Sequence, residues 1–108
     1  AISYMKENLN NPTFFVFTDN VEWVTENFKG LKYCLIDWNP KSGPLNYIDM
    51  QLMSCAKHNI IANSTYSWWG AWLNNNKNKI IIAPKFWYNP QIRKLHHLDI
   101  IPKNWITF

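Results

Sequence analysis

A cluster of small polar side chains, in residues 63–67, is the part of this sequence best suited to bind an anion. Three hydroxyls, those of Ser64, Thr65 and Ser67, stand with Asn63 between an apolar run and a predicted helix. The first backbone N–H groups of a helix have no partner within it, so they attract negatively charged ligands. The same pattern is equally typical of Ser64 acting only as a helix N-cap. Spacing alone leaves both interpretations open.

Asp49 is the second candidate, because it falls in the first turn of a helix predicted over residues 46–57. A carboxylate at this place can bond to the helix start and complement its dipole. Alternatively, it can face a cleft and accept hydrogen bonds from the paired N–H donors of a guanine edge. His58, His96 and His97 have no partner at metal-ligand spacing, so we interpret them as capping or surface histidines.

The composition predicts one globular domain. Hydrophobic residues make up 47% of the 108 residues, which excludes a disordered tail, and no apolar run approaches the roughly 20 residues of a membrane-spanning helix. The net charge of +4 suits an anionic partner, but the basic residues are scattered, which disfavours nucleic acid binding. Cys34 and Cys55 are expected to be buried free thiols. We attribute the abundance of Asn to the base composition of the gene.

The order of elements indicates an α/β fold. Continuous apolar runs at 14–17, 33–36, 59–62 and 79–83 are typical of buried parallel strands. Helical spacing separates them, starting with a capping box from Asp19 to Glu22 and ending with a helix over 65–73. We therefore predict an open, mostly parallel sheet with flanking helices. Residues 37–44 form a plausible binding loop, and the tail after Pro84 is expected to wrap back over the sheet.

The tryptophan-rich helix has apolar residues on every side, so it is expected to be buried all round. Gly70 within it predicts a close contact between helix and sheet. Residues 63–65 also match the N-glycosylation sequon, which we discount because they precede a buried helix.

Residues 58–73 closely resemble the carboxyl-terminal motif of the family 11 glycosyltransferases, the α-1,2-fucosyltransferase family. Residues 14–19, 49–53 and 81–84 follow that family's order, so the resemblance covers roughly 12–88. It implies a GT-B enzyme that moves fucose from GDP-fucose to a galactoside hydroxyl, with inversion and without a metal. The carboxyl-terminal half of such an enzyme is Rossmann-like and holds GDP.

Carried onto this sequence by motif position, Asp49 resembles the residue that reads guanine. Ser64, Thr65 and Ser67, with Asn63 in the same turn, resemble the donor-binding groups at the diphosphate. The family's upstream HxRRxD motif has no counterpart, since the surroundings of Arg93 do not match it. We therefore expect a fragment that lacks its amino-terminal half, and we assign no general base.

Two rival functions remain at this stage. One is a nucleotide-binding module without transfer activity, and the other is a carbohydrate-binding domain that uses its seven Trp residues as sugar platforms. The expected location is the bacterial cytosol or the inner face of the inner membrane, with possible peripheral membrane association. An animal enzyme of this type would lie in the Golgi membrane.

Overall fold

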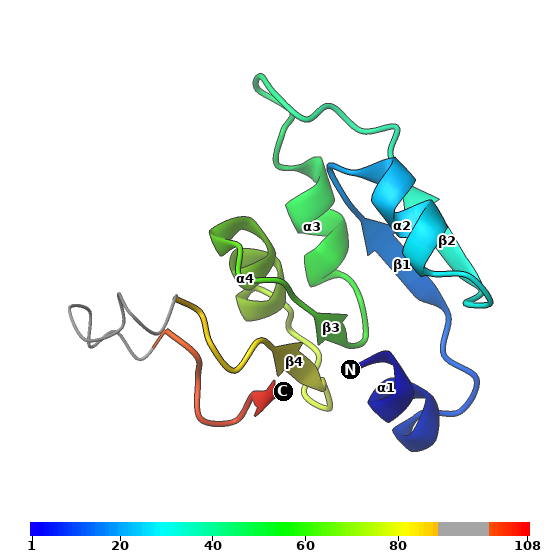
Figure 1. The fold of residues 1–108 in the computed structure, drawn as a ribbon. Coiled ribbons are helices and arrows are strands. Elements are labelled where there is room, and N and C mark those ends of the chain that lie inside the picture. Colours follow the sequence, from blue (N-terminus) through cyan, green and yellow to red (C-terminus); the bar gives the residue numbers. More distant parts are fainter. Residues whose placement is uncertain (89–99) are drawn as a thin grey trace. The chain divides into compact units, whose positions relative to one another are not determined.

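The computed structural model describes residues 1–88 and 100–108, which contain four helices and five strands (Figure 1). This part of the chain divides into two compact units, one of Ile2–Asp49 and one of Met50–Phe108 together with Ala1. The division falls inside one helix. The alternating order of strands and helices confirms the α/β class predicted from the sequence.

The first unit contains a strand–helix–strand motif. Its elements are α1 (Ile2–Asn8), β1 (Phe14–Phe17), α2 (Val21–Asn27) and β2 (Tyr33–Ile36). The two strands pair in parallel, with Phe14 opposite Tyr33 and Phe17 opposite Ile36, so both predicted strands are confirmed. Parallel pairing requires a crossover connection, which α2 supplies. Val24 is the buried residue of that helix.

The start of α2 corrects the predicted capping box. The N-cap is Asn20 rather than Asp19, and its side-chain oxygen accepts a hydrogen bond from the Trp23 backbone N–H at 2.9 Å. Thr18 fixes the cap, because its hydroxyl accepts from the Asn20 N–H at 2.9 Å. With the helix beginning one residue later, Glu22 no longer occupies the third helical position that a capping box requires.

The second unit contains a three-stranded parallel sheet of order β3-β4-β5. Its elements are α3 (Ile48–Ser54, which begins in the first unit), β3 (Asn59–Ile60), α4 (Thr65–Trp72), β4 (Ile81–Ala83) and β5 (Ile106–Thr107). All three residues of the central strand β4 are buried. Two of them, Ile81 and Ala83, pack in a core with Ile61, Ala71 and Trp105. The tail therefore does return to the sheet, as β5.

Strand pairing differs from the single open sheet expected from the sequence. The strands form two sheets, one of β1 and β2 and one of β3, β4 and β5. A continuous apolar run predicts a strand covered on both faces, which is correct for β4 but not for β1, where Phe15 is 60% exposed. Such a run carries no information about which strand lies beside it. The expected strands at 59–62 and 79–83 are also shorter in the structure.

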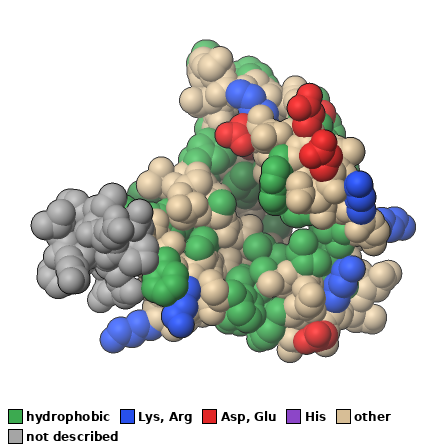
Figure 2. Space-filling view, viewed as in Figure 1, with side chains coloured by type: hydrophobic (Ala, Val, Ile, Leu, Met, Phe, Trp, Pro, Cys, Tyr) green, Lys and Arg blue, Asp and Glu red, His purple; other side chains and the backbone are tan. Residues whose placement is uncertain are grey.

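The tryptophan-rich helix α4 is buried on one face only, which corrects a second expectation. Gly70 and Ala71 are its buried residues, whereas Trp69 and Trp72 are 48% and 51% exposed. Figure 2 shows hydrophobic side chains on part of the visible surface. The close contact at Gly70 is real, but its partner is helix α3. A Cβ atom on Gly70 would lie 2.8 Å from the Cβ of Met53.

Cys34 is half-buried and Cys55 is exposed, so the prediction of two buried thiols was wrong, although both are free. None of the helices in the described ranges combines the length and apolarity that crossing a bilayer requires.

Candidate functional site

The turn from β3 into α4 brings together Asn63, Ser64, Thr65 and Ser67. Ser64 is the N-cap of α4, with the extended backbone typical of that position, yet its side chain accepts no hydrogen bond from the helix. Asn63, Ser64 and Thr65 are all exposed. The hydrogen bond that joins the helix to its N-cap runs from the Trp68 backbone N–H to the Ser64 carbonyl, at 2.9 Å. Within the described residues, the turn therefore presents a helix start that the Ser64 side chain does not cap, together with the exposed hydroxyls of Ser64 and Thr65.

Ser67 has a different role from its neighbours. Its hydroxyl donates to the carbonyl oxygens of Ser64, at 3.0 Å, and Ala62, at 3.3 Å. A hydroxyl has a single proton. Because that proton is directed to the chain's own backbone, Ser67 closes the turn on which Ser64 and Thr65 stand.

Buried asparagines hold the two ends of the β3–α4 segment together. Asn74, which is 2% exposed, donates to the side-chain oxygen of Asn59 at 2.7 Å and to the carbonyl of Ala56 at 2.7 Å. Asn59 in turn donates to the carbonyl of Met53 at 2.8 Å. The Asn74 side-chain oxygen accepts from the Asn76 N–H at 2.8 Å. This network was not predicted from the sequence, because the abundance of Asn was attributed to base composition.

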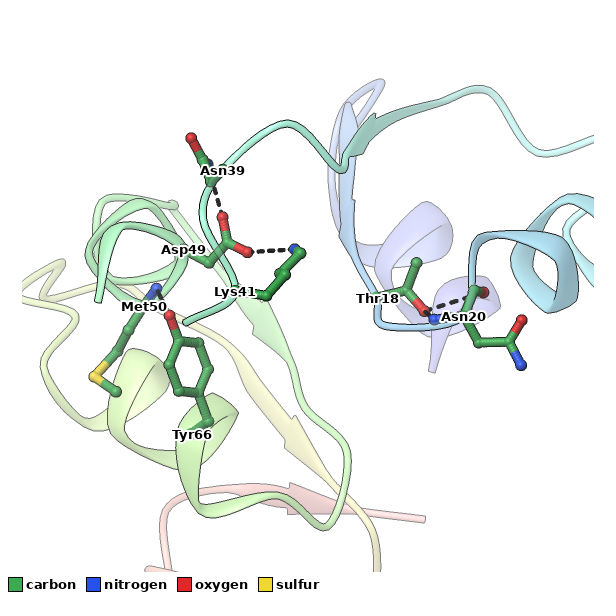
Figure 3. Close-up of polar contacts among 7 residues, drawn as sticks. All are labelled: Thr18, Asn20, Asn39, Lys41, Asp49, Met50 and Tyr66. Carbon is green, nitrogen blue, oxygen red and sulfur yellow. Dashed lines mark hydrogen bonds and ion pairs between the residues drawn. The ribbon is translucent and has the colours of Figure 1, made fainter. Parts of the chain in front are cut away.

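A second contact ties the start of α4 to α3. The Tyr66 hydroxyl accepts a hydrogen bond from the Met50 backbone N–H at 2.9 Å (Figure 3). Met50 is in the first turn of α3, where backbone N–H groups lack a partner within the helix. Tyr66 thus pairs one N–H group at the start of α3, and it fixes the first turn of α4 at the same time.

The charged side chains among the described residues of the second unit are all of one sign. The described residues from Met50 onward contain no Asp or Glu, and Asp99 is the only acidic residue of that half of the sequence. The same described residues include Lys57, Lys77, Lys79, Lys85 and Lys103. The unit that carries the exposed turn is therefore electropositive, which favours an anionic ligand. Counting acidic residues separately in the two halves of the sequence would have revealed this.

Asp49 belongs to the other unit, where it anchors a loop. It is 6% exposed, and its two carboxylate oxygens accept from the Asn39 amide and the Lys41 ammonium, each at 2.7 Å (Figure 3). Asn39 and Lys41 lie in the segment predicted to be a binding loop. Asp49 thus makes a contact that the sequence did not predict, since its partners lie eight and ten residues upstream of it rather than at the helix start.

His58 has the structural role expected of it. Its Nδ1 accepts the Ile80 N–H at 3.0 Å, immediately before β4. His96, His97 and Arg93 lie outside the described residues. In the described ranges, no group of three His, Cys, Asp or Glu side chains could hold a metal ion.

The observed arrangement is that of an α/β protein built from parallel strand–helix–strand units, with an uncapped helix start after one of the strands. The family model described as Glycosyl transferase family 11 matches residues 1–108, and the chain belongs to this family.

Two curated relatives from Escherichia coli agree with this assignment. The chain is 42% identical to an alpha-1,2-colitosyltransferase over 98% of its own length and 36% of the relative's. It is 43% identical to the O-antigen biosynthesis glycosyltransferase WbnK, over 82% of its own length and 29% of the relative's. The chain thus spans about a third of each relative. No solved structure matches it.

Proposed function

We propose that this chain is the donor-binding part of a glycosyltransferase that moves L-fucose from GDP-fucose to a galactoside hydroxyl in an α-1,2 linkage. The observation that carries the proposal is the uncapped, hydroxyl-bearing start of α4 in a unit whose described residues include no acidic side chain. Phosphate oxygens accept hydrogen bonds and carry negative charge, so such a helix start suits a diphosphate. Membership of family 11 supplies the reaction class.

In this proposal the chain, residues 1–108, is the Rossmann-like, carboxyl-terminal half of a GT-B enzyme, and an amino-terminal half completes the site. Its support is the parallel β3–α4–β4 motif, with the polar turn directly after β3. During transfer, the bond between the sugar and the diphosphate breaks, and its electron pair remains on the phosphate oxygen. The N–H groups and hydroxyls at the start of α4 offset that charge without requiring a metal. We therefore expect the complete enzyme to keep its full transfer activity in the presence of EDTA. A loss of activity would show that a metal is required.

The relatives favour one alternative donor. One of them is named an alpha-1,2-colitosyltransferase and the other an O-antigen biosynthesis enzyme. A colitosyl donor is therefore the second candidate. The O-antigen relative also supports the location that we propose, which is the bacterial cytosol or the inner face of the inner membrane, with peripheral membrane association. Assaying the complete enzyme with GDP-fucose and with an activated colitose donor, on a galactoside acceptor, tests both. GDP binding without transfer from either donor would leave only the nucleotide-binding function.

Removing the free hydroxyls of the turn is expected to weaken donor binding. In the complete enzyme, the double substitution Ser64→Ala and Thr65→Val should raise the Kd for GDP at least about tenfold, since hydrogen bonds to charged groups are each worth roughly 1.5–3 kcal/mol. Isothermal titration measures the Kd. Ser3→Ala, an exposed serine in α1, is the matched control. An unchanged Kd in the double variant would show that the diphosphate does not bind at this turn.

Asp49 tests the proposed guanine contact against its observed role as a loop anchor. If Asp49 reads guanine, Asp49→Ala should lower GDP affinity about tenfold or more, whereas Asn39→Ala and Lys41→Met should not. Loss of the anchor alone should cost only about 1 kcal/mol of stability, because the Lys41 side chain is 48% exposed. Titration and thermal unfolding of all three variants separate the roles. Equal losses of GDP affinity in the three would make Asp49 a positioning residue.

A further inference from the structure

A cavity of about 340 Å³ lies in the second unit, apart from the turn assigned to the donor. It is lined by Trp72, Lys79, Pro102, Asn104 and Trp105, and it includes none of the polar residues of the β3–α4 turn. Its lining comes from the end of α4, the segment before β4 and the segment leading into β5. A volume of this order is at the lower end of the range for small-ligand sites, about 300–1,000 Å³.

The aromatic wall of this cavity is held in place by stacked rings. The rings of Trp68 and Trp72 lie parallel within 10°, with centroids 5.1 Å apart, and Trp105 packs on Trp68 at 5.7 Å. Trp68 is itself fixed by a hydrogen bond from its indole N–H to the Ile100 carbonyl at 2.8 Å. Since Trp72 remains half-exposed despite this stack, it offers a positioned flat surface to a ligand.

The polar groups around the cavity favour a negatively charged ligand. The Lys79 ammonium donates to the Asn74 carbonyl, which positions it and leaves further N–H bonds for a ligand. The indole N–H groups of Trp72 and Trp105 have no acceptor among the described residues, and the Trp105 N–H is not sealed from solvent. Asn104 is exposed and contributes an amide. The lining contains no carboxylate to compete for these donors.

We propose that this cavity binds an acidic sugar unit of a glycan, with the sugar ring stacked on Trp72 and its carboxylate paired with Lys79. The C–H face of a pyranose is apolar and flat, so it packs by dispersion against an indole. Its hydroxyls and carboxylate are acceptors for the donors described above, and the ion pair would be charge-assisted. The site is separate from the proposed donor turn, so it would hold the enzyme on a glycan rather than take part in transfer.

The test follows the tryptophan indole N–H signals of the full chain by NMR while glucuronic acid is added. We expect the Trp72 and Trp105 signals to shift saturably, and glucose, which lacks the carboxylate, to bind about tenfold more weakly. Trp72→Leu and Lys79→Met should each weaken binding about tenfold. The matched controls are Trp23→Leu, which removes a ring that is 54% exposed in the other unit, and Lys77→Met. Both controls should bind as the parent chain does.

Three outcomes would overturn the proposal. They are the absence of shifts, equal affinity for glucose and glucuronic acid, and identical shifts with acetate alone, which would reduce the site to a carboxylate contact. The double substitution of Ser64 and Thr65 should leave glucuronic acid binding intact. A failure of this site is therefore distinguishable from a failure of the proposed donor turn.

Discussion

Replacing Asn74 with alanine is expected to lower the free energy of unfolding by about 2–6 kcal/mol, since the Asn59 side-chain oxygen and the Ala56 carbonyl each lose a partner at about 1–3 kcal/mol. The Asn74 side chain joins Ala56, Asn59 and the Asn76 backbone N–H. Without it, the Asn59 side-chain oxygen, in a residue 8% exposed, has no donor. Urea unfolding monitored by tryptophan fluorescence measures the change. Because this network fixes both ends of the β3–α4 segment, GDP affinity should fall as well.

Asn75→Ala is the matched control for this variant. Asn75 is adjacent in sequence but exposed, so its loss should change the free energy of unfolding by no more than about 0.5 kcal/mol. If Asn74→Ala and Asn75→Ala were equally stable, the asparagine network would contribute little, and the arrangement of the β3–α4 turn would need another explanation.

Gly70→Ala is expected to destabilise the chain by about 1–3 kcal/mol, although alanine favours a helix by about 1 kcal/mol over glycine. The new Cβ would lie 2.8 Å from the Met53 Cβ and 3.1 Å from its sulfur. The Met53 Cβ is fixed to the backbone of α3, so relief requires the two helices to move apart. Thermal unfolding shows whether Gly70→Ala lowers or raises the stability. A lower stability indicates a packing penalty, and a higher one indicates a gain in helix propensity.

A second substitution isolates the cause. Met53→Gly removes the Cβ that clashes, so the combination of Gly70→Ala with Met53→Gly should be more stable than the sum of the two separate effects predicts. The coupling free energy should favour the double variant by about 0.5–3 kcal/mol. Additive effects would show that helices α3 and α4 adjust without strain.

The sequence predicted the positions of the strands better than their pairing. Residues 14–17 and 33–36 became β1 and β2 with the expected bounds, because polar residues end each apolar run. The expected burial of these strands was wrong in part, since Phe15 is 60% exposed. Pairing into two sheets depends on contacts between distant segments, which a local pattern does not contain. Strand β5 has only Ile106 and Thr107, too short a run to be recognised.

The helix start at residues 63–65 was predicted from the sequence, but the contacts of the side chains proposed for the site were not. Residues 63–65 are exposed at a helix start, as the hydroxyl-rich pattern suggested. The commitment of Ser67 to backbone carbonyls and of Asp49 to Asn39 and Lys41 could not be predicted, because each depends on side-chain geometry. The exposure of Trp69 and Trp72 was missed because composition alone does not show which helix face meets the core.

The unequal exposure of the two thiols provides a way to mark the units separately. Cys55 is exposed in one unit and Cys34 half-buried in the other, so access alone favours alkylation of Cys55 first. A maleimide fluorophore could therefore be attached to Cys55 in the folded protein, and a second fluorophore to Cys34 after reversible unfolding. Energy transfer within this pair would follow the separation of the two units in solution as nucleotide is added.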